Sequence, residues 1–319
     1  MNTFNATILS NEAVAAKIFK LVLDAPDLAQ SSRPGQFVQV KIADTCAIPK
    51  TSFKFKRVFF YAIILGGGVV MNTFNATILS NEAVADKIFK LILDAPDLAQ
   101  SSRPGQFVQV KIADELTLRR PLGIAGTTDG KVTIFYRAVG RGTDILSKKR
   151  IGDTLNVLGA LGNGFTPRDG KILLVGGGMG LAPLLCAAQI FKSDVLIGGR
   201  NFSEVNFWIE EFRPLVEKIF VTTDDGSTGK KGFVTDLLPD LPNDYAAVYT
   251  CGPEIMMRGV ADFALNKNLP CEVSFEKRMA CGLGACLSCS IDTADGRRKV
   301  CKDGPVFDAE KVFGGGSRE

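Results

Sequence analysis

The 319-residue sequence contains no histidine. Histidine triads, histidine proton shuttles and histidine metal sites are therefore excluded. Any redox or acid–base chemistry must come from cysteine, from backbone amides or from bound cofactors. No apolar segment reaches the ~18 residues that a membrane helix needs, and the nearest one, residues 58–65, is far too short. We therefore expect no membrane association.

A basic surface is also lacking on the main body of the chain. The formal net charge is +4, but residues 1–70 contain eight Lys and Arg against four Asp and Glu. Residues 71–319 are neutral, with 30 side chains of each sign. Because nucleic-acid binding needs clustered cations on one face of the folded body, we expect no nucleic-acid partner.

The amino terminus lacks the charged and then apolar residues of a secretory signal. Four of the eight cysteines lie within residues 281–301, at the uneven spacing that is typical of ligands rather than of a disulfide framework. Disulfides persist mainly in oxidising compartments. The cysteine usage therefore predicts a reducing, cytoplasmic location.

Residues 1–44 recur at 71–114 with two changes. The first copy then diverges, whereas the second continues into further strand-like sequence. A copy that supplies about three strands without the rest of their barrel leaves strand edges unpaired. We interpret residues 1–70 as a partial duplicate of the N-terminus that is non-functional, with Met71 as the functional start. A strand-swapping arm is the alternative.

The stretch that follows Met71 contains short strand-like segments separated by turns. Large apolar residues alternate along residues 89–93, and Pro104-Gly105 marks a turn into the next segment. Further strands are expected at residues 131–139 and 154–158. Short strands with turn punctuation predict a small antiparallel β-barrel, which we assign to residues 71–168.

From Lys171 the pattern changes to strands that alternate with helices. The run from Lys171 to Val175 is almost wholly apolar, as expected of a buried parallel strand. Three further strands are predicted, at 195–197, 219–221 and 246–250. This alternation predicts a Rossmann-like parallel α/β domain over residues 169–270, followed by a cysteine-rich subdomain over residues 271–319. The fold class is therefore α+β, with several domains.

Two motifs in the barrel are candidates for flavin and phosphate contacts. One ends a strand, where an arginine followed by proline can present its guanidinium and backbone to a flavin ring or a phosphate: Arg120, Pro121, Leu122 and Gly123. The other joins a strand to a glycine-rich turn that opens a short helix, where free amides can bind phosphate: Phe135, Tyr136, Arg137, Gly142 and Thr143. The alternatives are a solvated strand end and an ordinary N-capped helix.

A glycine run follows the first strand of the α/β domain and opens a helix. This is the context of a dinucleotide phosphate loop, with Gly176, Gly177, Gly178, Gly180 and Pro183 as candidate residues. Cys251 ends the fourth strand and could face a nicotinamide ring as a catalytic residue. The alternative for Cys251 is a buried cysteine before a helix.

The tail carries the most specific pattern. Cys281, Cys286 and Cys289 have the C-x4-C-x2-C spacing of plant-type [2Fe–2S] proteins, and Cys301 follows after eleven intervening residues. Two irons need four thiolates, and glycines within the loop let it curl so that amides point at the sulfurs. A structural zinc site is the alternative, but zinc favours paired C-x2-C knuckles and there is one here.

Taken together, the RPxx strand end, the GxGT turn, the GGGxGxxP loop and the CGP strand end resemble the ferredoxin–NADP reductase superfamily. Within it, residues 274–286 and 300–308 closely resemble the electron-transfer subunits of NAD-dependent dihydroorotate dehydrogenase B. The resemblance covers about residues 71–312. Family members usually carry Ser where this chain has Gly123, so a hydroxyl contact near the flavin is missing.

The resemblance implies an FAD in the barrel, a [2Fe–2S] cluster on the four cysteines and NAD+ as co-substrate at the glycine run. Residues 120–123 would lie by the isoalloxazine, residues 135–137 along the ribityl and adenosine side, and Gly142 with Thr143 at the pyrophosphate. It also implies a partner, an FMN-containing catalytic subunit in a heterotetramer of two copies of each. Electrons from dihydroorotate would pass through the cluster and FAD to NAD+, in de novo pyrimidine (UMP) biosynthesis.

A subunit of a related NAD(P)H-linked sulfide dehydrogenase or ferredoxin:NADP oxidoreductase is the alternative enzyme. A partner-binding electron carrier with a degenerate nucleotide site is a different class, and the intact glycines at 176–180 argue against it. The choice between NAD and NADP stays open on the residues alone, because Arg200 follows the second sheet strand and could contact a 2′-phosphate. The resemblance favours NAD.

Overall fold

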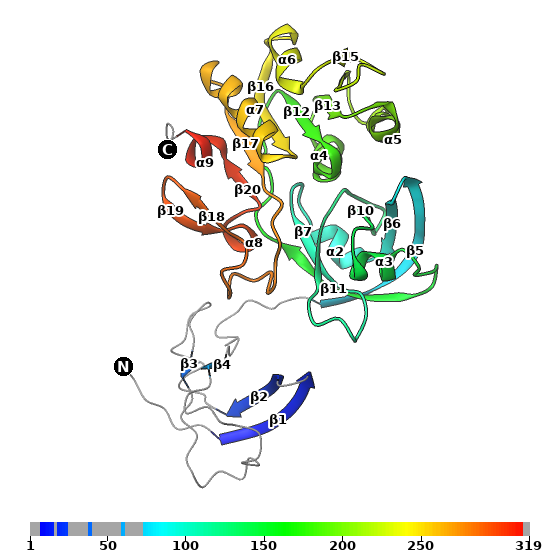
Figure 1. Cartoon of the computed structure of the whole chain (residues 1–319), viewed down its shortest axis with the longest axis vertical. Coiled ribbons are helices and arrows are strands. Elements are labelled where there is room, and N and C mark those ends of the chain that lie inside the picture. Colours follow the sequence, from blue (N-terminus) through cyan, green and yellow to red (C-terminus); the bar gives the residue numbers. More distant parts are fainter. Residues whose placement is uncertain (1–6, 16–17, 25–37, 40–58, 61–72, 315–319) are drawn as a thin grey trace. The chain divides into compact units, whose positions relative to one another are not determined.

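The computed structural model describes residues 7–15, 18–24, 38–39, 59–60 and 73–314. The chain divides into two compact units, Met1–Val70 and Met71–Glu319 (Figure 1). Across the described ranges, no helix is both long and apolar enough to cross a bilayer.

The described residues of the first unit form two antiparallel pairs, β1 (Thr7–Ala15) with β2 (Ile18–Asp24) and β3 (Val38–Gln39) with β4 (Phe59–Phe60). The β1–β2 register, with both of its shifts, recurs seventy positions later in β5 (Thr73–Ala85) and β6 (Ile88–Asp94). The repeated sequence therefore builds the same hairpin twice. Only the second hairpin has further strands beside it among the described residues, because β11 pairs with β5 and β10 with β6.

The second unit begins with a seven-stranded antiparallel sheet in the order β8-β7-β11-β5-β6-β10-β9. The strands not yet given are β7 (Phe107–Lys111), β8 (Arg120–Gly123), β9 (Gly126–Thr128), β10 (Lys131–Arg137) and β11 (Thr154–Leu161). The two end strands, β8 and β9, are separated in the chain by Ile124 and Ala125. The Ile124 N–H donates to the Gln106 carbonyl and the Ala125 N–H to the Thr133 carbonyl, which closes the sheet. The predicted β-barrel is thus confirmed.

The barrel core is filled by side chains from alternate strand positions, as a closed sheet requires. Ala76, Ile78, Leu91, Leu93 and Val110 are all buried in one cluster. Two short helices belong to the barrel, α2 (Pro96–Ser101) and α3 (Arg141–Leu146). Leu98 of α2 and Leu146 of α3 are fully buried in the same cluster.

A second seven-stranded sheet follows in the order β15-β14-β13-β12-β16-β17-β20. Its strands are β12 (Lys171–Gly177), β13 (Ser193–Gly199), β14 (Ile219–Thr223), β15 (Lys230–Lys231), β16 (Tyr245–Cys251), β17 (Cys271–Ser274) and β20 (Val306–Asp308). All pairs are parallel except β17 with β20. The chain runs outward from β12 through β15 and returns to β16 on the other side of β12. The topological switch point therefore lies between β12 and β16, where doubly wound folds bind ligands.

Helices cover both faces of this sheet (Figure 1). Ile172 and Leu174 of β12 face the cluster that contains α4 (Leu181–Ile190) and α5 (Phe202–Phe212). Leu173 and Val175 face the opposite cluster, which contains residues of α6 (Val234–Leu237), α7 (Glu254–Asn266) and α9 (Ala309–Phe313). The 3-10 helices Gly178–Gly180 and Leu238–Asp240 complete these connections. Burial on both faces explains the nearly continuous apolar run of β12.

The cysteine-rich tail is not separate from the parallel sheet. It contains the hairpin β18 (Ser290–Thr293) and β19 (Gly296–Lys299) and the short helix α8 (Val300–Asp303), and it returns through β20 to pair with β17. The predicted domain boundary after residue 270 would therefore assign β17 to the cysteine-rich subdomain, although β17 is a strand of the parallel sheet. The sequence of β17, Cys-Glu-Val-Ser, is short and partly polar, so only its pairing with β16 and β20 reveals it as a sheet strand.

Candidate functional site

The four tail cysteines lie in one irregular loop and the helix that faces it. Backbone N–H groups point at their sulfurs: Leu283 N and Cys286 N lie 3.4 Å from Cys281 Sγ, and Gly284 N lies 3.1 Å from Cys301 Sγ. Gly282 and Gly284 have φ angles of +70° and +78°, which only glycine adopts without strain. The glycines thus allow the amides to face the thiols, as the sequence predicts.

The sulfurs fall into two pairs, Cys281 with Cys286 and Cys289 with Cys301, whose members interact with one another. Among the described residues, no three His, Cys, Asp or Glu side chains are arranged to hold a single metal ion. Two thiol pairs suit a cluster with two irons better than one tetrahedral zinc. The donor set therefore fits a [2Fe–2S] group.

The four thiols differ in burial. Cys289 and Cys301 are 1% and 2% exposed, whereas Cys281 and Cys286 are partly exposed. Burial raises the pKa of Cys301, and the adjacent Cys289 raises it further. Burial also raises the pKa of Cys286, but hydrogen bonds with Ser288 and Cys281 outweigh it and bring that pKa to about 6. The Cys281–Cys286 side of the loop is thus the more accessible one.

The cysteine loop lies directly against the barrel. A Cβ on Gly282 would be 2.6 Å from Gln109 Nε2, and Gln109 Nε2 also approaches Met279 Sδ at 4.0 Å. Gln109 is completely buried, and its Oε1 has no hydrogen-bond partner. On β7 it is paired with Pro121 of β8. One residue therefore connects the cysteine loop to the strand that carries the predicted flavin motif.

The two arginines before Pro121 have different environments. Arg119 donates through Nη1 to the backbone oxygens of Gln109 (3.2 Å) and Asn156 (2.9 Å), so it ties β7 to β11. Arg120 lies against the first turn of α3, since a Cβ on Gly142 would collide with its guanidinium. The structure thus brings together two of the predicted flavin-site segments, 22 positions apart in sequence. Pro121, Leu122 and Gly123 are half-buried beside them.

Phe135 and Tyr136 do not line an open site. Phe135 is 3% exposed and packs on Trp208 of α5 with ring centroids 5.0 Å apart. Tyr136 is 2% exposed, stacks on Phe89, and donates its hydroxyl to Asn81 Oδ1 at 2.8 Å. Because β10 is covered on both faces, its successive residues are buried in different clusters. The side chains of these two residues are therefore turned into the protein, and the expectation that residues 135–137 line the flavin stays a prediction.

Arg137 and Thr143 complete the predicted set in the barrel. Arg137 is half-buried, and its Nε has no hydrogen-bond partner, so a donor is left for a bound group. The Thr143 hydroxyl accepts from the N–H groups of Val139 (3.0 Å) and Gly140 (3.2 Å). That hydroxyl therefore stabilises its own turn, which is the ordinary capping role that the sequence left open.

The glycine run lies at the switch point of the parallel sheet. Gly176 pairs with Cys251 of β16 and Gly177 with Gly198 of β13. Gly178 has open space where a side chain would be, whereas Gly180 touches the Cys251 carbonyl so closely that no side chain fits. A Cβ on Gly123 would be 3.9 Å from Pro183, so the flavin-motif strand ends beside this helix. The backbone here leaves room for a ligand on the open side of the loop.

Cys251 is brought to this loop, but its side chain is fully buried. Burial raises the pKa of its thiol well above the usual value, so it stays protonated at neutral pH. Burial of the thiol does not favour the predicted catalytic role at the nicotinamide, which stays a prediction. The buried cysteine before a helix, also considered from the sequence, is what the structure shows.

The comparisons with known proteins agree on one family. The model for the iron–sulfur cluster binding domain of dihydroorotate dehydrogenase B matches residues 276–313. The dihydroorotate dehydrogenase B (NAD(+)) electron transfer subunit of Caldanaerobacter subterraneus subsp. tengcongensis is 37% identical over 75% of this chain and 97% of its own length. The same subunit from Clostridium acetobutylicum is 41% identical over 72% of this chain and 93% of its own length. This chain belongs to that family.

A solved structure supports the same fold for these electron transfer subunits. The NADH-dependent reduced ferredoxin-NADP oxidoreductase, described for flavin-based electron bifurcation, is 30% identical and covers 77% of this chain and 91% of its own. The TM-score is 0.64. The predicted likeness to ferredoxin–NADP reductases is therefore confirmed. An electron transfer subunit serves an oxidoreductase and acts with a catalytic partner chain.

Sequence reasoning missed two contacts of this subunit. Gln109 stands between Val108 and Val110 in the middle of β7, and an amide between two buried apolar residues is a signal of a special contact. Lys90 bonds Glu211 of α5 at 2.7 Å and lies over the Phe135 ring, which joins the barrel to the α/β domain. No sequence pattern pairs residues 121 positions apart.

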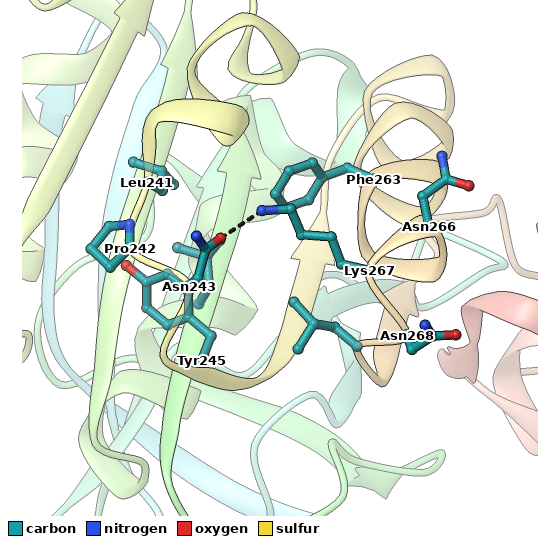
Figure 2. A pocket seen from close by; sticks show the side chains of 10 residues that line it. Leu241, Pro242, Asn243, Tyr245, Phe263, Asn266, Lys267 and Asn268 are labelled. Atoms are coloured by element: carbon teal, nitrogen blue, oxygen red, sulfur yellow. Dashed lines mark hydrogen bonds between the residues drawn. The ribbon is translucent and has the colours of Figure 1, made fainter.

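Two cavities in the described part of the subunit lie outside this site. A cavity of about 410 Å³ lies at the amino ends of β12 and β16, opposite the glycine run. It is lined by ten residues, among which Lys267 donates to Asn243 (Figure 2). A second hollow of about 610 Å³ lies between the segment after the barrel and the cysteine-rich tail. Neither contains a residue predicted to hold a cofactor.

Proposed function

We propose that this chain passes electrons from the FMN of a dihydroorotate dehydrogenase catalytic subunit through a [2Fe–2S] cluster and FAD to NAD+, in de novo pyrimidine (UMP) biosynthesis. The observation that carries the proposal is the cysteine loop, in which the sulfurs of Cys281, Cys289 and Cys301 accept backbone N–H groups and that of Cys286 contacts the Ser288 hydroxyl. The bound groups would supply single-electron transfer at the cluster and conversion between one- and two-electron chemistry at the flavin.

Cys281, Cys286, Cys289 and Cys301 would hold the cluster. The N–H groups of Leu283, Gly284 and Cys286 point at the sulfurs and would stabilise negative charge on them, which tunes a redox group by hydrogen bonding. Burial of Cys289 and Cys301 excludes water from one side of the site. Gln109 would fix the distance between this loop and the flavin strand.

The flavin would lie along β8, next to Pro121, Leu122 and Gly123. Arg120 and the backbone at Gly142 would bind its phosphates together, because the structure places them in contact. The unpartnered Nε of Arg137 is a further donor for the same group. Phe135, Tyr136 and the Thr143 hydroxyl would act indirectly, by holding β10 and the turn in place.

NAD+ would bind at the switch point between β12 and β16. Gly176, Gly177, Gly178 and Gly180 would let its pyrophosphate approach the backbone, and the first turn of α4, which contains Pro183, would support it. Cys251 would contribute its backbone position rather than its thiol. The proximity of Gly123 to Pro183 would bring nicotinamide and flavin together.

The partner that we propose is an FMN-containing catalytic subunit, in a heterotetramer of two copies of each chain. Anaerobic co-expression with candidate catalytic subunits, followed by mass measurement and cofactor analysis, tests this. We expect one FAD, two iron and one FMN per pair of chains, and dihydroorotate-dependent formation of one NADH per orotate. A stable complex with a glutamate-synthase-like partner, and none with the FMN subunit, would contradict the assignment.

A ferredoxin:NADP oxidoreductase subunit is the second candidate, favoured by the likeness to the bifurcating enzyme. It would share the cofactors and differ in the partner. Reduction of ferredoxin by the purified complex with NADPH, without any response to dihydroorotate, would favour this candidate. A related sulfide dehydrogenase would be revealed by sulfide-dependent activity.

We also propose that residues 71–319 carry the function and that residues 1–70 are a non-functional duplicate. Three quarters of this chain suffices to cover 97% of the C. subterraneus relative, and residues 71–319 make up about that share of the sequence. Removal of residues 1–70 should leave cofactor content and activity intact, and loss of FAD would contradict this. A reducing, cytoplasmic location suits the seven described cysteines, which are all free thiols.

A further inference from the structure

Arg200 lies one residue beyond β13, at the carboxyl edge of the parallel sheet. The neighbouring residues of β13 and β12, Gly198 and Gly177, are paired, so Arg200 is close to the glycine run. The backbone around it is fixed, because Asp224 N–H donates to the Gly199 carbonyl and Asp225 N–H to the Arg200 carbonyl. In doubly wound folds this edge receives the adenosine ribose of a dinucleotide.

The Arg200 side chain already forms an ion pair with Glu204 in the first turn of α5. Both Nε and Nη2 of Arg200 donate to Glu204 Oε1, the first at 2.7 Å, and the Arg200 backbone N–H donates to Glu204 Oε2 at 3.0 Å. The Glu204 N–H donates to Asn201 Oδ1, which caps the helix. Both carboxylate oxygens are thus engaged, and the carboxylate is held beside the guanidinium.

The positive charge of Arg200 is balanced by neighbouring carboxylates. Hydrogen bonding to Arg200 lowers the pKa of Glu204, so the carboxylate is ionised at neutral pH. Asp224 adds a second carboxylate that acts on the Arg200 guanidinium. The positive charge of Arg137 in the barrel also lowers the pKa of Glu204, but a bound flavin phosphate would compete for that cation. A dianionic phosphate arriving here would therefore meet the Asp224 carboxylate and an arginine whose charge Glu204 already balances.

We propose that the Arg200–Glu204 pair selects the unphosphorylated nucleotide, so that NAD(H) is used in preference to NADP(H). Glu204 can accept a hydrogen bond from a ribose hydroxyl, whereas a 2′-phosphate would be repelled and would have to displace Glu204 from Arg200. The inference rests on the proposed nucleotide site. It settles a choice that the residues alone leave open, because an unpaired arginine at this position could contact a 2′-phosphate.

The test compares NADH and NADPH as electron donors to ferricyanide, with the FAD-loaded full-length chain. Each nucleotide oxidised reduces two ferricyanide ions. We expect wild type to favour NADH in kcat/KM by about tenfold or more, and Glu204→Gln to reduce that preference about tenfold by lowering KM for NADPH. Calorimetric Kd values for NADP+ should fall by the same factor. The added substitution Arg200→Gln should cancel the gain.

A matched control is available on the same helix. Glu210 pairs with Arg213 at 2.8 Å on the exposed side of α5, and Glu210→Gln removes an equal charge away from the ribose position. We expect it to leave the preference unchanged. The Glu204→Gln effect should also shrink as salt rises, because the Arg200 side chain is 72% exposed.

Two results would overturn the inference while leaving the proposed function in place. One is a wild-type preference for NADPH. The other is a Glu204→Gln variant whose ratio and NADP+ affinity equal those of wild type and Glu210→Gln. Failure of the wild type to oxidise either nucleotide would instead refute the proposed function, and the inference with it.

Discussion

Substitution of Gly282 by alanine tests the contact between the cysteine loop and Gln109 of the barrel. Its φ of +70° is a left-handed conformation that alanine adopts with strain. A Cβ there would lie 2.6 Å from Nε2, 2.7 Å from Cγ and 3.0 Å from Cδ of Gln109. Gln109 is fully buried on a strand paired on both sides, so it has no open space to move into. Gly282→Ala should therefore shift the loop.

The expected cost has two parts. The left-handed backbone costs about 1–2 kcal/mol for a residue with a Cβ. Overpacking against an enclosed side chain adds about 1–3 kcal/mol. Gly282→Ala should thus cost about 2–5 kcal/mol and, because metal binding and folding are coupled, should lower cluster content as well.

Gly296→Ala is the matched control. Gly296 turns the β18–β19 hairpin with φ +94°, and a Cβ there meets nothing within 4 Å. This variant has the same kind of backbone cost without the collision, so it should lose only about 1–2 kcal/mol. Denaturant unfolding, iron content and visible absorbance of anaerobically purified protein measure both variants.

The double variant Gln109→Ala with Gly282→Ala isolates the collision. Removing the Gln109 side chain should recover part of the Gly282→Ala loss, with a coupling energy of about 1–2 kcal/mol in a double-mutant cycle. Equal losses for Gly282→Ala and Gly296→Ala, together with zero coupling to Gln109, would refute the contact. The claim that Gln109 joins the loop to the flavin strand would then be wrong.

Three further predictions follow from buried side chains. Burial raises the pKa of Tyr136 and of Tyr249 to about 12. The neutral phenols therefore stabilise the folded state fully below pH 10, and this stabilisation is lost as pH rises through 12. The denaturant midpoint should fall between these two pH values, and it should fall less in Tyr136→Phe. Trp208 is 1% exposed and packs on Phe135. Trp208→Ala should lower the free energy of unfolding by about 3–5 kcal/mol, as measured by circular dichroism. An equal loss for Trp208→Phe would contradict the packing role. Cys251→Ala should leave kcat for NADH oxidation unchanged, and a large fall in kcat with normal folding would restore a catalytic role for that thiol.

The sequence by itself determined the order of the antiparallel and parallel sheets, the glycine loop and the cysteine cluster of the tail. These features depend on local patterns: the apolar run of β12, glycines directly after a strand, and thiols spaced within one loop. Such patterns are set by residues close in the chain, so periodicity and spacing reveal them. The resemblance of the tail to one family was also a property of local sequence.

Only the tertiary structure decided which side chains face the site. Phe135 and Tyr136 were expected at the flavin, yet both faces of β10 are covered, one by the barrel core and one by α5. Cys251 is buried because helices pack on both sides of its sheet, and Gln109 meets Gly282 across 173 positions of sequence. Glu204 forms an ion pair with Arg200 because α5 begins beside the end of β13. These outcomes depend on packing between distant segments, which the linear pattern of apolar and polar residues does not contain.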